Sequence, residues 1–330
     1  MTKISAMGAL LTGAGWDKAD RTPLAGDASA RRYERLTDAE TGRTAVLVIT
    51  PPDGSLPAFL ALADHLAHAG LSTPRILATD PEAGLAVLED LGDGTFTRLI
   101  ATDPQREPEL YTAATDLLIP LQDVPIPGNV QTLDSQRLAD MTDLAFTRYA
   151  QPVTGTNAGP RVIPRLADIF HDTLRGPDGF VHRDYHADNL IWLPDREGNA
   201  RVGLLDFQDA VAGPRAYDLV SLLQDARRDV SVAVEIAMID RFRDATGISD
   251  HDLRTAYAVV GLQRNLRILG VFARLAQDYG KPHYLDLVPR VFAHVERNLD
   301  HPALAPVAQQ IQDALPRPTA DTLNRLKQMA

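Results

Sequence analysis

The sequence predicts an α+β protein built from a small sheet-rich part, residues 1–88, and a larger helical part, residues 93–330. Before residue 89, β-branched and apolar segments alternate with turn sequences, which is typical of strands. After residue 92, apolar residues recur at intervals of three and four over long stretches, which is typical of helices. A chain of 330 residues also fits two modest domains or one domain with two lobes.

The first part is predicted to contain four strands and one long helix. The strands are Arg31–Leu36, Thr44–Thr50, Ile76–Ala78 and Leu85–Leu88. The helix begins after Ser55, a residue type that caps helices, and ends at Gly70. Met1–Leu11 is expected to form a short amphipathic helix and not a signal peptide, because Gly8 interrupts its apolar stretch. We therefore expect a cytoplasmic protein.

The second part is predicted to be helical apart from one strand pair. An apolar stripe with helical spacing runs from Leu110 to Leu121. The strand pair is Asn189–Leu193 and Arg201–Phe207, joined by a turn. The further predicted helices are Gln136–Ala150, Pro164–Leu174, Ala216–Asp225, Val230–Thr246, Asp252–Asp278 and Leu285–Leu299.

The composition excludes several classes of function. The chain carries 33 basic and 44 acidic residues, a net charge of −11, which argues against a nucleic-acid reader or a polybasic membrane anchor. No apolar run is long enough to span a bilayer. Cysteine is absent, so thiolate chemistry and disulfides are excluded. Only four of the basic residues are lysines and 29 are arginines, so a mechanism that needs a lysine has few candidates.

One segment concentrates polar residues between two apolar, strand-like segments. Its alternating His182, Asp184, His186 and Asp188 could in principle bind zinc, but the spacing matches no zinc signature. A polar turn in a buried hairpin is the purely structural interpretation. The same segment also contains a pattern that is typical of phosphoryl transfer.

That pattern is H-R-D-x-x-x-x-N, which runs from His182 to Asn189, followed after a hairpin by Asp206-Phe207-Gln208. Phosphoryl transfer needs a carboxylate that orients the attacking hydroxyl and oxygen ligands that hold Mg²⁺. We expect Asp184 to accept the hydroxyl proton, and Asn189 and Asp206 to bind the metal.

The segment resembles the catalytic core of the aminoglycoside-phosphotransferase and choline-kinase-like superfamily. The resemblance spans roughly residues 20–300, includes a Gly26–Tyr33 loop, and is most specific in the block 181–218, which ends at Asp218. It implies a bilobal protein-kinase-like fold, with residues 89–92 as the hinge and ATP between the lobes. It also implies that backbone groups near Glu89 and Leu91 meet adenine, and that the loop containing Ser29 covers the phosphates.

Among members of this superfamily, the motifs are most similar to those of the anomeric N-acetylmuramate/N-acetylglucosamine kinases of cell-wall recycling. Only eleven residues separate Asp206 from Asp218, too few for the activation segment of a protein kinase, which favours a small-molecule acceptor. Aminoglycoside, choline and homoserine kinases are the alternatives within the fold, and a pseudokinase-like binding protein is the alternative outside catalysis. We expect a monomer.

The expected phosphate site departs from the kinase pattern, and the residues of the expected acceptor site each have two interpretations. The strand Thr44–Thr50 lacks the lysine that kinases use for phosphates, and Arg31 or Arg32 could replace it. An exposed position on the strand is the other interpretation of these arginines. The residues that we expect at the acceptor, each with solvation or local pairing as an alternative, are His186, Asp209, Arg228, Arg264 and Arg267.

Overall fold

The computed structural model describes residues 2–24, 31–51, 55–174 and 179–329. They form two compact units. Unit 1 comprises Met1–Leu117 and Ala187–Asp209, and unit 2 comprises Leu118–His186 and Ala210–Ala330. The predicted hinge at residues 89–92 thus lies inside unit 1, and the domain limits drawn from the sequence stay a prediction. No helix in the described ranges is long and apolar enough to span a membrane.

Unit 1 is built on a five-stranded antiparallel sheet in the order β1-β2-β3-β5-β4. Its strands are β1 (Asp20–Leu24), β2 (Arg32–Thr37), β3 (Thr44–Ile49), β4 (Ile76–Asp80) and β5 (Leu85–Glu89). This sheet, together with the helices of both units, confirms the predicted α+β class. The four predicted strands are β2 to β5, and β1 pairs with β2 at the edge of the sheet.

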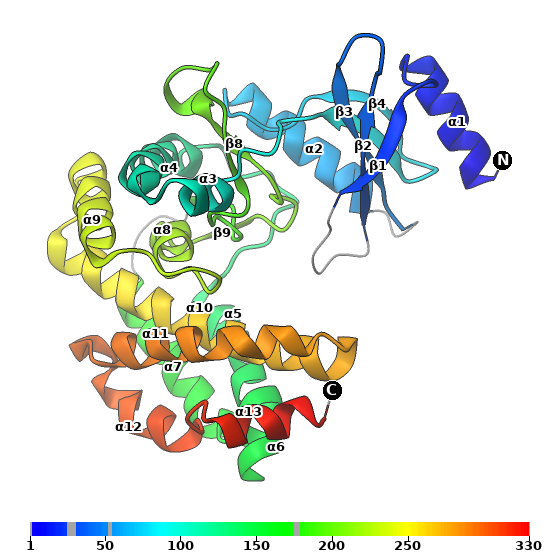
Figure 1. Ribbon diagram of the computed structural model, residues 1–330. Coiled ribbons are helices and arrows are strands. Elements are labelled where there is room, and N and C mark those ends of the chain that lie inside the picture. The colour runs from blue at the N-terminus through cyan, green and yellow to red at the C-terminus, as the bar shows by residue number, and fades with distance from the viewer. Residues whose placement is uncertain (1, 25–30, 52–54, 175–178, 330) are drawn as a thin grey trace. The chain divides into compact units, whose positions relative to one another are not determined.

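The two faces of this sheet carry different residues. On one face, alternate residues of β2, β3 and β5 pack against α1 (Lys3–Gly13), and Leu36 and Leu47 are fully buried there. The predicted N-terminal helix is therefore confirmed as α1. Figure 1 shows α1 and α2 (Ser55–His68) on opposite sides of these strands. The intervening positions of β2, including Tyr33 and Arg35, point to the α2 side.

A hairpin and a short helix complete the part of unit 1 that matters for the site. The hairpin consists of β7 (Leu190–Trp192) and β8 (Val202–Leu204), as the sequence predicts, and a short 3-10 helix, Gly198–Arg201, precedes β8. The hairpin is joined to the rest of the unit by backbone hydrogen bonds, from the N–H of Trp192 to the carbonyl of Gly94 (2.9 Å) and from the N–H of Leu204 to the carbonyl of Ser72 (2.8 Å). A second 3-10 helix is Pro104–Arg106, and the remaining helices are α3 (Phe96–Thr102) and α4 (Glu107–Gln122), which continues into unit 2.

Unit 2 is helical apart from the short pair β6 (Gly179–Val181) and β9 (Val211–Gly213). Its central element is α10 (Asp250–Tyr279), a helix of 30 residues that packs along α11 and against α8 (Figure 1). The other helices are α5 (Ser135–Asp140), α6 (Gln151–Thr154), α7 (Gly159–Thr173), α8 (Ala216–Leu223), α9 (Val232–Thr246), α11 (Val288–Leu299), α12 (Ala305–Ala314) and α13 (Ala320–Lys327), with 3-10 turns at Pro282–Leu287 and Pro302–Leu304.

Three predicted helices differ from the structure. The helix predicted over 136–150 is interrupted, because α5 ends at Asp140 and a π-helical segment follows over Ala145–Ala150, where α10 packs closely. The helix predicted from Pro164 begins at Gly159, since Pro160 is tolerated in the first turn. The predicted helix 285–299 starts as the 3-10 turn and becomes α-helical only at Val288.

The close approach of α10 to the π-helical segment depends on Gly270. A Cβ atom at this position would overlap the backbone of Leu144, whereas a Cβ atom on Gly8, inside α1, would meet open space. We expect Gly270→Ala to lower the free energy of unfolding by about 3 kcal/mol or more, because the backbone of Leu144 must move. The control Gly8→Ala should raise it by about 0.5–1 kcal/mol. Urea unfolding of both variants measures this, and a similar stability for the two would contradict the packing argument.

Candidate active site

The loop that carries Asp184 is anchored by one buried carboxylate. The Asp218 side chain, at the start of α8, accepts hydrogen bonds from the backbone N–H groups of His182 (2.6 Å) and Arg183 (2.8 Å). Arg183 has a left-handed backbone, with φ of 77°, a conformation that a non-glycine residue adopts only when its surroundings enforce it. The His182 ring is buried and meets Tyr185 edge to face. These contacts fix the loop and leave Asp184 half-buried.

Burial sets the protonation of this anchor. Asp218 is 1% exposed, and burial raises its pKa to about 7, although the two N–H donors and the nearby Arg264 guanidinium favour the carboxylate. Asp184 contributes in the opposite direction, because a second negative charge raises the pKa of Asp218. The anchor therefore changes its charge near neutral pH.

Asn189 and Asp206 lie at neighbouring positions of unit 1, where the hairpin ends. The Leu205 N–H donates to the Asn189 carbonyl (2.9 Å), so the residue before β7 meets the residue after β8. Asp206 has φ of 60° and an exposed side chain that accepts a hydrogen bond from Gln208 (2.7 Å). The next residue, Phe207, is fully buried. Asp206 therefore follows directly after the residue that bonds the Asn189 backbone, and the apolar ring of the next residue is buried in the core.

The four residues of the zinc alternative do not gather into a metal site. Among the residues that the structure describes, no group of three or more histidine, aspartate or glutamate side chains could hold a metal ion. His182 and His186 are buried in unit 2, and Asp188 belongs to unit 1.

Arg31 and Tyr33 lie on the same side of β2 as Asp206. The Arg31 guanidinium lies 5.6 Å from the centre of the Phe59 ring, and Phe59 stacks on Phe207 with a centroid distance of 5.1 Å. The pKa of Tyr33 is raised, chiefly by burial and also by the charge of Asp206, and the hydrogen-bonded Arg31 opposes the shift. These five side chains form what we call the Arg31 cluster.

Arg32 points the other way. It pairs with Ile49, which belongs to the core on the α1 face of the sheet, and its own side chain is exposed. Arg31 and Arg32 were equal candidates in the sequence, and strand alternation separates them. Ser29, the remaining candidate of this group, lies outside the described residues.

Arg35 of β2 holds the segment around residues 89–92, which is predicted to contact adenine. The Arg35 guanidinium forms ion pairs with Asp90 (2.6 Å) and Asp93 (3.0 Å), which raise the pKa of Arg35. The Glu89 side chain is held by Arg196 (2.9 Å). Between these fixed points, the backbone N–H of Leu91 has no hydrogen-bond partner in the part of the chain that the structure describes. A loop with an open backbone donor can receive a planar heterocycle.

The acceptor candidates are divided between several places. Arg264 and Arg267 lie one turn apart on α10 in unit 2. His186 is 4% exposed and contacts Arg227 (3.3 Å), and its pKa is well below the usual value because of burial and the charges of Arg227 and Arg264. Arg228 instead interacts with the charges around Asp229. Asp209 is exposed at the end of a segment of unit 1.

Sequence reasoning missed three residues of these clusters: Tyr33, Arg35 and Phe59. Their signal was the alternation of β2, because Arg31, Tyr33 and Arg35 occupy every second position and must share one face. Phe59 is one of several apolar residues in the predicted helix between Ser55 and Gly70, and its residue type gives no sign of a site.

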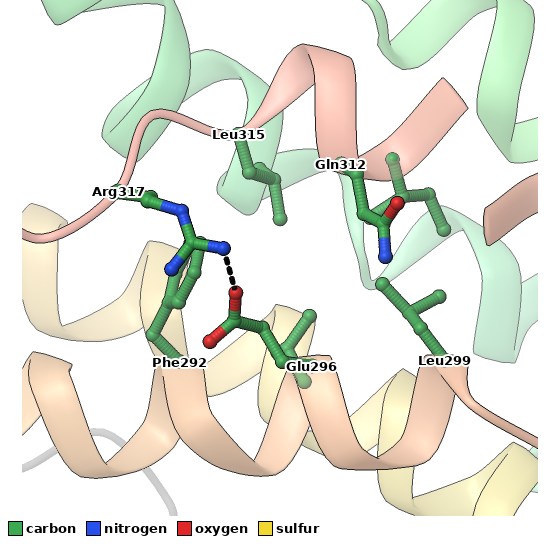
Figure 2. Close-up of a pocket in the computed structure, with 8 residues that line it drawn as sticks. Phe292, Glu296, Leu299, Gln312, Leu315 and Arg317 are labelled. Carbon is green, nitrogen blue, oxygen red and sulfur yellow. Dashed lines mark ion pairs between the residues drawn. The ribbon is translucent and has the colours of Figure 1, made fainter. Parts of the chain in front are cut away.

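A separate pocket of about 180 Å³ lies between α11 and α12 in unit 2. Figure 2 shows apolar side chains, including Phe292, Leu299 and Leu315, around it, and the Arg317–Glu296 ion pair (2.7 Å) beside them. No residue of the predicted site lines this pocket.

Comparisons with known proteins show the family of this chain. A sequence model described as the phosphotransferase enzyme family matches residues 20–258. The chain belongs to this family. An N-acetylmuramate/N-acetylglucosamine kinase from Caulobacter vibrioides is 38% identical over 91% of this chain and 93% of its own length. The predicted family membership is therefore confirmed.

Solved structures of other proteins share the fold. A choline/ethanolamine kinase family protein from Mesorhizobium loti superimposes with a TM-score of 0.64 over 99% of this chain and 100% of its own, at 16% identity. An aminoglycoside phosphotransferase from Streptomyces rimosus, solved with ADP and streptomycin, gives 0.54 over 81% of this chain and 99% of its own, at 18% identity. At such low identity the likeness concerns the fold.

The raised pKa of Asp218 predicts a pH dependence of stability. Between the pKa of the unfolded chain, 3.8, and about 7, the folded protein keeps a proton that the unfolded chain has lost. The contribution of Asp218 to stability should therefore fall as the pH rises through this range, by up to about 1.4 kcal/mol per unit. Because asparagine does not titrate, the unfolding free energy of the wild type minus that of Asp218→Asn should decrease from pH 4.5 to 7.

Urea unfolding at several pH values measures this difference, and groups that titrate equally in both proteins cancel. Parallel pH profiles for the wild type and Asp218→Asn would contradict the assignment.

Proposed function

We propose that this protein transfers the γ-phosphoryl group of ATP to the C1 hydroxyl of N-acetylmuramate or N-acetylglucosamine. The observation that carries the proposal is the Asp184 loop, with its left-handed Arg183 held by the buried Asp218 carboxylate. A loop fixed in this way can hold one carboxylate ready for an acceptor hydroxyl. The choice of sugar is supported by the name of the relative from Caulobacter vibrioides.

Asp184 acts on the acceptor. As the C1 oxygen forms its bond to the γ-phosphorus, the bond to the leaving ADP oxygen breaks and the hydroxyl proton moves to the Asp184 carboxylate. A hemiacetal hydroxyl is more acidic than an ordinary alcohol, so a weak base is sufficient. The half-buried position of Asp184 keeps it accessible to such a substrate.

The residues of unit 1 fit a nucleotide and its metal. The open N–H of Leu91 suits a hydrogen bond to adenine, and the guanidinium of Arg31 suits the phosphates. Asn189 and Asp206 offer an amide oxygen and a carboxylate, a donor set that suits Mg²⁺, which keeps several waters and binds through few protein ligands. Bound there, Mg²⁺ would offset the negative charge of the phosphates.

The substrate assignment predicts the outcome of a panel. With ATP and Mg²⁺, we expect N-acetylmuramate and N-acetylglucosamine to be phosphorylated and to lose their reducing end, because C1 carries the new phosphate. Kanamycin, choline and homoserine should not react. Asp184→Asn should lower kcat by about 100-fold or more, because the proton acceptor is lost. ³¹P NMR and a reducing-sugar assay measure these outcomes.

Turnover of kanamycin, choline or homoserine without either amino sugar would replace the proposed substrate. A phosphorylated sugar that still reduces would refute transfer to C1. If no compound reacts although ATP binds with Mg²⁺, the pseudokinase-like alternative is favoured.

Strand alternation predicts which arginine replaces the missing lysine. Arg31→Ala should raise the KM for ATP about 10-fold, as expected for the loss of a charged hydrogen bond, and Arg31→Lys should restore part of the affinity. Arg32→Ala is the matched control and should change the KM by less than about twofold, because its side chain lies on the other face of the sheet. A larger effect of Arg32→Ala in steady-state kinetics would reverse this choice.

A further inference from the structure

Arg264 of α10 is connected through Ser221 to the loop that carries Asp184. It is 6% exposed, and its Nη2 donates a hydrogen bond of 2.6 Å to the hydroxyl of Ser221 on α8. That hydroxyl lies 3.5 Å from the carbonyl oxygen of Arg183. α10 is thus linked through α8 to the residue beside Asp184, and all of these residues belong to unit 2.

Neither Arg264 nor Arg267 forms an ion pair with a carboxylate in the described part of the chain. The Nη1 atom of Arg264 is buried and has no hydrogen bond, and Arg267, one turn along the helix, has neither a hydrogen bond nor an ion pair in the described part of the chain. Arg254, near the start of the same helix, is by contrast paired with Asp250 (3.0 Å) and Asp240 (3.3 Å). A buried guanidinium nitrogen that makes no hydrogen bond or ion pair is unfavourable.

Electrostatics connects Arg267 with Asp184. Burial lowers the pKa of Arg267, and the positive charges of Arg183 and Arg264 act in the same direction, while Asp184 and Tyr217 oppose the shift. The Arg267 guanidinium therefore lies within the field of the carboxylate that receives the acceptor proton. Arg264 and Arg267, i and i+3 on one helix, can both point to this region.

We propose that Arg264 and Arg267 form a carboxylate-binding site for the acceptor, and that the group bound there is the lactyl carboxylate of N-acetylmuramate. A guanidinium matches a carboxylate through two parallel N–H···O bonds, and a ligand carboxylate would supply the direct ion pair that these arginines lack in the described part of the chain. The inference rests on the proposed function and goes beyond it, because N-acetylglucosamine has no carboxylate.

The transferring phosphoryl group is the other anion that could meet these arginines, and the two sources make different predictions. A phosphoryl contact would serve every acceptor alike, whereas a carboxylate contact would serve only N-acetylmuramate. Arg264 and Arg267 belong to unit 2 together with Asp184, whereas the Arg31 cluster belongs to unit 1. This favours the carboxylate of the acceptor over the phosphoryl group as the bound anion.

The test compares both sugars in three variants of the full chain. Arg267→Gln should lower the ratio of kcat/KM for N-acetylmuramate to that for N-acetylglucosamine by about 10- to 100-fold, the loss expected for a charged hydrogen-bonded pair. Arg267→Lys keeps the charge without the fork and should fall between wild type and Arg267→Gln. Arg254→Gln, an exposed change on the same helix, should leave the ratio as it is.

Thermal unfolding separates this role from a structural one. Because Arg267→Gln removes an unpaired, desolvated charge, we expect the Tm without ligand to rise by about 2 °C. Addition of N-acetylmuramate should raise the Tm of the wild type and have a smaller effect on Arg267→Gln. A clearly lower Tm for the unliganded variant would overturn the proposal, because Arg267 would then be part of the scaffold.

The two proposals fail in different ways. If the wild type phosphorylates neither sugar, the proposed function is wrong. If it phosphorylates both and Arg267→Gln reduces both kcat/KM values equally, only the carboxylate site is refuted and a phosphoryl contact replaces it.

Discussion

The buried Asp218 carboxylate, which accepts two backbone N–H groups, holds the rest of the candidate site in unit 2. Those bonds fix a left-handed residue, Arg183, immediately before Asp184. Without them, the loop would return to ordinary backbone conformations and Asp184 would lose its position. Arg264 strengthens the same arrangement, since its charge favours the ionised form of Asp218 and its bond to Ser221 supports the loop.

In unit 1, the side chains of β2 alternate between the two faces of the sheet, and this alternation positions the residues on the nucleotide side of the proposed site. Every second residue from Arg31 points to the α2 face, so this one stretch supplies Arg31 and Tyr33 to the Arg31 cluster and Arg35 to the ion pairs with Asp90 and Asp93. The residues between them contribute to the core with α1 or face solvent. A shift of one residue in the pairing would exchange these two sets completely.

Several of the abundant arginines make contacts in and around the candidate site. A guanidinium can lie over an aromatic ring, as Arg31 does, form ion pairs with two carboxylates, as Arg35 does, or donate a hydrogen bond from a buried position, as Arg264 does. A lysine offers a point charge and loses its proton more readily on burial. The lysine-poor composition is thus compatible with a site that binds anions.

The sequence by itself determined the α+β class, the main strands and helices, and the three catalytic candidates, because these depend on local periodicity and on a motif of fixed spacing. It left Arg31 and Arg32 equivalent, since they are adjacent and differ only in the face that sheet pairing gives them. It also could not find the π-helical break after α5 or the unpaired state of Arg267, because both depend on what α10 meets far away in the chain. Tertiary structure decided these points, since burial and counter-ions are properties of the packed molecule.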